Sequence, residues 1–182
     1  MKNAALFIVD VQNDFLPGGA LAVKNGDAVI EPINTLSQKF EWVLASKDWH
    51  PQNTVHFDKW PVHCVRGTAG ASFPENLDVS RIKKVFLKGT GNTDDGYSAF
   101  EATNDDLESY LKINGIKRLY VAGLATDYCV KATALDAVRK GFEVYTVREA
   151  VRAVNLNPGD EEKAWSEMKN EGIKIISINE LK

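Results

Sequence analysis

Residues 4–10 of this 182-residue chain read AALFIVD, six apolar residues followed directly by an acid. An apolar run without alternation is typical of a strand buried on both faces of a parallel sheet. Further apolar or alternating runs predict five more strands, at 42–46, 84–87, 119–122, 142–147 and 174–178. Helical spacing predicts helices at 27–40, 105–114, 126–140 and 160–171. Because strands alternate with helices, the sequence predicts an α/β fold: a Rossmann-like, doubly wound, mostly parallel six-stranded sheet with helices on both faces.

Length and composition predict a single domain over residues 1–182, since one hydrophobic core commonly serves a chain of this size. The net charge of −3, from 22 basic and 25 acidic side chains, argues against nucleic acid or a membrane surface as partner. The first apolar run is too short for a signal peptide or a membrane span. Two cysteines, Cys64 and Cys129, cannot build a disulfide framework, so we expect a cytoplasmic protein. Homo-oligomer formation is left open.

One long segment lacks the periodicity of the rest. Residues 48–82 show no convincing helical or strand periodicity and contain three prolines and two glycines, at positions 51, 61, 74, 67 and 70. All three histidines of the chain, His50, His56 and His63, lie in it. Irregular stretches of this length are uncommon in compact domains and are usually functional. The glycine-rich patterns of dinucleotide and phosphate loops are missing after the first strand, so we expect no nucleotide site.

Chemically active side chains follow four of the predicted strands. Asp10 follows the first, Asp48 and His50 the second, Lys88 the third, and Cys129 comes shortly after the fourth. Ligands of open parallel sheets bind at the carboxyl ends of the strands, so these side chains are expected to converge there. Cys129 falls in the first turn of a predicted helix, where the helix N-terminus and a nearby lysine favour the thiolate. A buried, inert cysteine is the alternative; together, however, the residues supply a nucleophile, a proton acceptor and an electrostatic partner.

The histidine-containing segment predicts a metal site. Asp48 and His50 lie two residues apart, so on an extended chain both side chains point to the same side. Carboxylate and imidazole ligands suit Zn²⁺, Fe²⁺ or Mn²⁺. The alternative is three loop histidines with separate surface roles. Cys64 points away from its neighbour His63 on an extended chain, and we expect it to be a packing residue.

Six short motifs resemble those of the nicotinamidases, which belong to the isochorismatase-like cysteine hydrolases. They occur in the order found in that family and span residues 10 to 129: DVQNDF at 10–15, DWHP at 48–51, WPVHC at 60–64, KG at 88–89, YSAF at 97–100 and GLATDYC at 123–129. The nucleophile and its partners alone specify the superfamily, whereas the added metal motif points to nicotinamide. Gly96 departs from the pattern, because relatives often carry serine there.

The resemblance implies a role for each of these positions. The catalytic triad is Asp10, Lys88 and Cys129, and the metal ligands are Asp48, His50 and His63, with His56 a ligand whose use varies among relatives. The oxyanion hole is formed by the backbone N–H groups of Ala125 and Cys129, after a non-proline cis peptide at Leu124–Ala125. The substrate pocket is lined by Phe15 and Trp60, which sandwich the pyridine ring, and by Tyr97, Phe100 and Leu124.

The activity implied is hydrolysis of nicotinamide to nicotinate and ammonia through a thioester, with one divalent metal ion binding the pyridine nitrogen. Zinc is the expected metal, with iron or manganese as alternatives; pyrazinamide is an expected second substrate and NAD salvage the expected process. Three other functions remain open at this point. They are another amidohydrolase or isochorismatase-type hydrolase of the superfamily, a metal hydrolase that uses metal-bound water with Asp10 as base, and a metal- or small-ligand-binding module with an inert Cys129.

Overall fold

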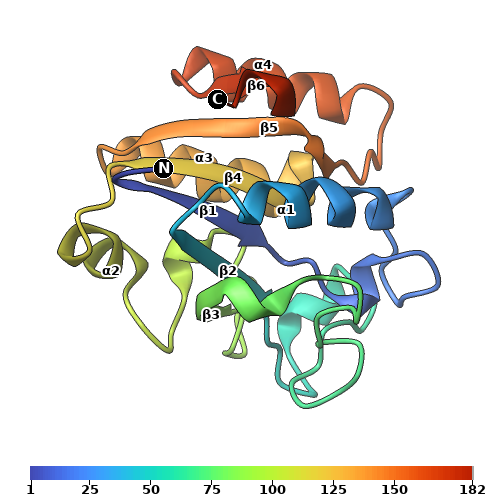
Figure 1. Cartoon of the computed structure of the whole chain (residues 1–182). Coiled ribbons are helices and arrows are strands. Elements are labelled where there is room, and N and C mark those ends of the chain that lie inside the picture. Colours follow the sequence, from blue (N-terminus) through green and yellow to red (C-terminus); the bar gives the residue numbers. More distant parts are fainter. Residues whose placement is uncertain (182) are drawn as a thin grey trace.

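The computed structural model describes residues 1–181 and is built around a six-stranded sheet in the order β3-β2-β1-β4-β5-β6 (Figure 1). The strands are β1 Ala4–Val9, β2 Trp42–Asp48, β3 Ile82–Lys88, β4 Arg118–Leu124, β5 Glu143–Arg152 and β6 Lys174–Ile176. All neighbouring pairs run parallel. The predicted six-stranded α/β fold is confirmed. The predicted strand to 178 ends earlier, because Ser177 caps a short 3₁₀ turn at Ile178–Glu180.

Four α-helices connect the strands: α1 Ile30–Ser37, α2 Leu107–Ile113, α3 Lys131–Arg139 and α4 Asp160–Asn170. Two of the predicted helices are shorter than expected because their first turns differ. The helix predicted at 27–40 begins with a 3₁₀ turn, Gly26–Val29, before α1. The helix predicted at 126–140 begins with a π-helical turn, Thr126–Val130, before α3. Single π turns are frequent at functional sites, and this one contains Cys129.

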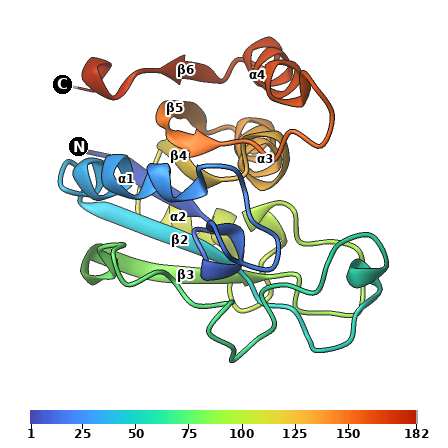
Figure 2. The same cartoon turned by 90° about the vertical axis from the view of Figure 1, so that its right-hand side faces the viewer.

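Helices cover both faces of the sheet, as predicted, and β1 shows how (Figure 2). Leu6 and Ile8 pack into the core on the α1 face, together with Ile33 and Leu36 of that helix. The alternate side chains of β1 pack into a second core with residues of α2, α3 and α4. All six residues of β1 are buried, which explains its uninterrupted apolar sequence.

The strand order reverses between β1 and β4: β2 and β3 lie to one side of this pair, β5 and β6 to the other. The carboxyl ends of strands at such a switch point form a crevice where ligands bind. The irregular segment 49–81, teal to green in Figure 1, gathers at the end to which the β1 and β2 arrows point. Its regular structure is limited to two short 3₁₀ turns, Val55–Asp58 and Val79–Arg81, and one isolated bridge between His50 and Val65. The predicted irregular stretch is therefore confirmed, and it lies against the crevice.

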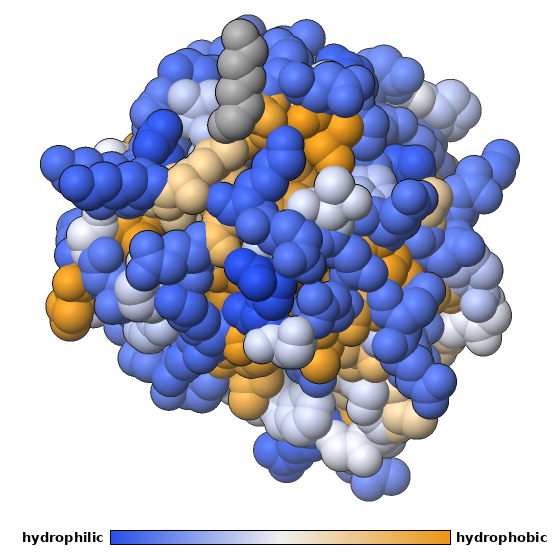
Figure 3. All heavy atoms as spheres, in the orientation of Figure 1, coloured by the Kyte–Doolittle hydropathy of each residue, from blue (hydrophilic) through white to orange (hydrophobic). Residues whose placement is uncertain are grey.

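The outer surface is mostly hydrophilic on the face seen in Figure 3, with apolar side chains visible between polar ones. Among residues 1–181, no helix has the length and apolar character needed to cross a bilayer.

Candidate active site

The predicted triad meets around a fully buried ammonium group. Lys88, the last residue of β3, places Nζ 2.8 Å from Asp10 Oδ2 and 3.5 Å from Cys129 Sγ. The same Nζ donates to the Gly96 carbonyl oxygen at 2.5 Å and to the Asp48 carboxylate. Both Lys88 and Asp10 have no exposed surface. The structure thus brings Asp10, Lys88 and Cys129 together, although they lie far apart in the sequence.

The strand ends at the switch point fix the position of Asp10. It follows β1 directly and has a left-handed backbone with φ of 47°, which is uncommon for a non-glycine residue and concentrates at functional sites. Ser46 of β2 donates a hydrogen bond from Oγ to Asp10 Oδ1 at 2.7 Å. On the other side, Gly123 of β4 has a φ of 114°, and a Cβ there would lie 2.1 Å from the Val9 carbonyl oxygen. Only glycine allows β4 this close to β1 beside the site.

A steric constraint explains why glycine stands at position 96, where this chain departs from the family pattern. The φ of Gly96 is 79°, and a Cβ at this position would lie 2.3 Å from the backbone nitrogen of Gly89. The close approach of the two ends of loop 89–98 lets the Gly96 carbonyl reach Lys88. The cis peptide predicted at Leu124–Ala125 is confirmed, and it leads directly into the turn that carries Cys129.

Burial determines the protonation states of the triad. It raises the pKa of the Asp10 carboxyl to about 6, against the opposing effect of the Lys88 ammonium. Burial also raises the pKa of the Cys129 thiol well above its usual range, by more than Lys88 lowers it. For Lys88 itself burial disfavours the charge, but the carboxylates of Asp10 and Asp48 dominate and raise its pKa well above the usual range. Lys88 favours the Cys129 thiolate, as expected, but burial opposes it more strongly, so this site favours a protonated thiol beside a carboxylate that can accept its proton.

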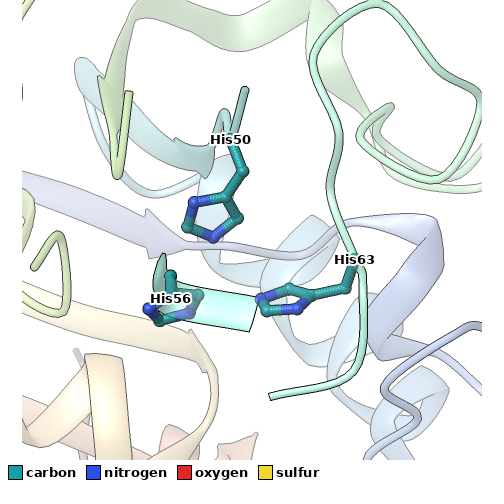
Figure 4. Close-up of side chains that lie close together, drawn as sticks. All are labelled: His50, His56 and His63. Atoms are coloured by element: carbon teal, nitrogen blue, oxygen red, sulfur yellow. The ribbon is translucent and has the colours of Figure 1, made fainter. Parts of the chain in front are cut away.

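The three histidines form a buried cluster, shown in Figure 4 with their rings turned toward one another. One ring nitrogen of each lies within 4.8 Å of the others. Each Nδ1 contacts an oxygen: the Gly89 carbonyl from His50 at 2.8 Å, the Asp94 carboxylate from His56 at 3.0 Å, and the Pro61 carbonyl from His63 at 2.6 Å. Because these oxygens can only accept, each Nδ1 carries a proton, and in the neutral imidazole each Nε2 then has a free lone pair.

Asp48 connects the histidine cluster to the triad. Its Oδ1 accepts from Lys88, while its Oδ2 lies 3.7 Å from His50 Nε2 and 3.8 Å from His63 Nε2. His50 Nε2 is buried and has no hydrogen-bond partner among the described residues. Two carboxylates also share the single ammonium of Lys88, since Asp10 pairs with it too. An orphaned imidazole nitrogen beside a carboxylate oxygen fits a divalent cation with N and O ligands.

A cavity lies between the triad and the histidine cluster. Its wall is mainly apolar, as in most small-molecule sites. The predicted residues in its wall are Phe15, Asp48, His56, Trp60, His63, Tyr97, Leu124, Ala125 and Cys129. Residues in the wall that the sequence did not indicate are Leu21, Val23, Tyr128 and Val154. Tyr128 belongs to the GLATDYC motif but was assigned no role, whereas Leu21, Val23 and Val154 follow no motif and reach the cavity only because of how their loops fold.

Phe100 was predicted to line the pocket, but its side chain packs elsewhere. Its ring packs against Phe142 at 6.3 Å between centroids, with Lys140 Nζ 5.5 Å from the ring centre. It lies among the residues packed on the core of the α2–α4 face, away from the cavity wall. Ser98 caps the 3₁₀ turn Ala99–Glu101, and this turn directs the Phe100 ring into the core.

Two residues of the first motif hold the irregular segment in place, which the sequence did not reveal. The Gln12 amide donates to the Asp48 carbonyl at 2.8 Å and to the Ala71 carbonyl at 3.0 Å, and its oxygen accepts from the Asp48 N–H at 2.8 Å. Asp14 Oδ2 accepts from the Cys64 N–H at 2.7 Å. Polar side chains that satisfy backbone groups in this way fix a loop as strand pairing fixes a sheet.

Comparison with known proteins agrees with this geometry. The family model described as Isochorismatase domain matches residues 4–180. The chain belongs to the isochorismatase family. It is 39% identical to the nicotinamidase of Acinetobacter baylyi over 97% of this chain and 93% of that protein. The resemblance to nicotinamidases found in the sequence is confirmed.

Solved structures give the same result. The nicotinamidase/pyrazinamidase of Acinetobacter baumanii has a TM-score of 0.94 and 38% identity, covering 100% of this chain and 99% of that one. The pyrazinamidase of Pyrococcus horikoshii, in complex with zinc, has a TM-score of 0.85 and 44% identity, covering 96% of this chain and 99% of that one.

Proposed function

We propose that this protein hydrolyses nicotinamide to nicotinate and ammonia, with Cys129 as the nucleophile. The observation that carries the proposal is the placement of the Cys129 thiol in the wall of a cavity whose other wall contains histidines with free Nε2 atoms. A planar pyridine amide has one reactive carbonyl and one ring nitrogen, which match these two walls. The names of the similar proteins support the same substrate class.

The first half of the reaction forms the thioester. The protonated thiol transfers its proton to Asp10 as sulfur attacks the amide carbonyl, so the thiolate needs to exist only during attack. The backbone N–H groups of Ala125 and Cys129 stabilise the oxyanion of the tetrahedral intermediate. When the C–N bond breaks, Asp10 returns the proton to the departing nitrogen and ammonia leaves.

The second half regenerates the enzyme. Asp10 accepts a proton from the attacking water, the C–S bond breaks, and the proton returns to Cys129 as nicotinate forms. Lys88 remains charged throughout because both neighbouring carboxylates favour the ammonium. It holds Asp10 in place and offsets part of the negative charge that develops on sulfur.

His50, His56 and His63, together with Asp48, would hold the divalent metal ion, for which we propose zinc. Bound there, the ion supplies a Lewis-acidic contact for the pyridine ring nitrogen. Phe15 and Trp60 hold the ring between them, and Tyr97 and Leu124 complete the slot. Pyrazinamide has a nitrogen at the equivalent ring position and is the proposed second substrate, which the name of the zinc-containing relative supports.

The deciding experiment measures ammonia release from nicotinamide by the purified protein, before and after a chelator and after zinc is restored. We expect release that is lost with chelation and recovered with zinc. Alkylation of Cys129 tests the chemistry separately: a hydrolase that uses metal-bound water would remain active after alkylation. Absence of ammonia release from nicotinamide and pyrazinamide alike would refute the proposal.

A further inference from the structure

Asp94 contacts one member of the histidine cluster from outside it. It lies between β3 and the turn Ala99–Glu101, and its Oδ1 accepts from His56 Nδ1 at 3.0 Å. Its Oδ2 pairs with Lys59. The Asp94 side chain is 23% exposed and that of His56 is 6% exposed, so the bond between them is largely shielded from water.

His56 is held differently from the other two histidines. His50 and His63 donate to backbone carbonyls, whose positions follow from the path of the main chain. His56 sits on a short 3₁₀ turn, Val55–Asp58, and donates instead to a carboxylate 38 residues further along the chain. Its ring also stacks on His50, with 4.5 Å between centroids and 21° between planes. The orientation of His56 therefore depends on Asp94.

We propose that Asp94 is a positioning residue that makes His56 a metal ligand. A carboxylate that accepts from the outer nitrogen of an imidazole fixes the tautomer and ring orientation and makes the inner nitrogen a stronger ligand. Here the outer nitrogen is Nδ1 of His56, and the inner one is the Nε2 that faces the cluster. The inference rests on the metal site of the proposed function.

The same carboxylate connects the metal site to the aromatic wall of the cavity. Tyr97 donates its hydroxyl to Asp94 Oδ1 at 3.0 Å, and Trp60 donates its indole N–H to the Tyr97 oxygen at 3.1 Å. Trp60 and Tyr97 both line the cavity. Asp94 thus accepts two hydrogen bonds, one from the proposed metal ligand His56 and one from Tyr97 in the cavity wall. Separate variants can remove these two hydrogen bonds one at a time.

The experiment titrates Zn²⁺ into the metal-stripped full-length protein in competition with a chromophoric chelator. We expect Asp94→Ala to weaken Zn²⁺ binding by about 10–100-fold, the usual cost of removing such an outer partner. Asp94→Asn retains an acceptor for Nδ1 and is expected to weaken binding less. Asp95→Ala is the matched control, since Asp95 is an exposed acid on the same loop, and its Zn²⁺ affinity is expected to equal that of the unmodified protein.

A double-mutant cycle tests whether Asp94 acts through His56. In a His56→Ala background, Asp94→Ala is expected to cause no further loss of Zn²⁺ affinity, because the group that it positions is already gone. Tyr97→Phe removes only the hydrogen bond from the Tyr97 hydroxyl to Asp94. This variant is therefore expected to keep the Zn²⁺ affinity while raising KM for nicotinamide. The thermal midpoint of each metal-free variant shows whether the fold is kept.

Each outcome decides a specific point. Equal Zn²⁺ affinities for Asp94→Ala and Asp95→Ala overturn the inference, even if the protein hydrolyses nicotinamide. Additive losses from His56→Ala and Asp94→Ala also overturn it, because they would assign Asp94 a general electrostatic effect. If Asp94→Ala weakens Zn²⁺ binding through His56 in a protein that releases no ammonia, the inference stands and the proposed function fails.

Discussion

The triad and the histidine cluster belong to one site, yet the chain holds them in different ways. Asp10 directly follows β1, and Lys88 ends β3 in register with Asp48 of β2. His56 and His63 lie within segment 49–81, where side-chain contacts and isolated backbone bonds replace strand pairing. Paired strands resist displacement collectively, whereas each loop contact acts alone. The triad is therefore expected to tolerate changes in its surroundings better than the histidine cluster does.

The largest expected effect separates the two groups chemically. Cys129→Ala removes the atom that bonds to the substrate, so turnover of nicotinamide is expected to fall by at least about a thousandfold. Metal content is expected to stay unchanged, because Cys129 contributes nothing to the histidine cluster. Steady-state ammonia release and metal analysis of the same preparation check both parts. A variant that retained more than about a tenth of the original rate would contradict the thiol mechanism.

The reciprocal change should affect the metal and leave the thiol. His50→Ala or His63→Ala removes one of the proposed ligands, so metal content is expected to fall from about one ion per chain toward none. Nicotinamide turnover is expected to fall by at least about a hundredfold, while iodoacetamide still modifies Cys129 in the folded protein. The chain is long enough to fold without metal, so circular dichroism should show the same secondary structure. Full metal content in both variants would remove the histidines from the ligand set.

The sequence predicts the residues at the strand ends better than those in segment 49–81. Asp10 and Lys88 could be placed because apolar runs mark buried strands and because parallel strands end at a common edge. His50, two residues after β2, shares this advantage. The sequence alone could bring these side chains to one edge, but their pairing with a single ammonium depends on the sheet order, which periodicity does not determine.

The loop contribution was less predictable, for a physical reason. Phe100 was expected in the pocket, but the capped turn at Ala99–Glu101 directs it into the core. Gln12, Asp14 and Asp94 act through side-chain hydrogen bonds to residues more than thirty positions away, and no local pattern encodes such pairs. Ser46 gave the one available signal, as a hydroxyl at the end of the apolar run 42–45. A buried hydroxyl requires a partner, and its partner is Asp10.

Substrate choice tests whether the two groups act on one molecule at once. Benzamide has the amide of nicotinamide and nearly its shape, but it lacks the ring nitrogen. A site built around one specific polar contact rejects an analogue without it by up to roughly 10⁴-fold, so kcat/KM is expected to be at least about a hundredfold lower for benzamide. The apolar slot alone would discriminate far less. Comparable rates on the two amides would show that the histidine cluster does not orient the substrate and would favour a general amidase.

The smallest expected effect concerns the pH dependence and isolates the triad from the metal. Asp10 must be deprotonated to accept the thiol proton, so kcat/KM is expected to fall as the pH drops through its pKa of about 6. The Ser46 hydroxyl donates to Asp10 and stabilises the charged form, so Ser46→Ala should raise this pKa. The acidic limb of the profile should then move upward by about one pH unit, which corresponds to the ~1.4 kcal/mol of a hydrogen bond to a charged group. Histidine protonation and metal loss also lower activity in acid, but they affect both proteins equally, so the difference between the two profiles reports on Asp10.

Ser37→Ala is the matched control, since Ser37 is an equally buried serine that donates to the Asn34 carbonyl of α1. Coincident acidic limbs for Ser46→Ala and Ser37→Ala would show that another group limits the reaction at low pH, and the role of proton acceptor would pass from Asp10.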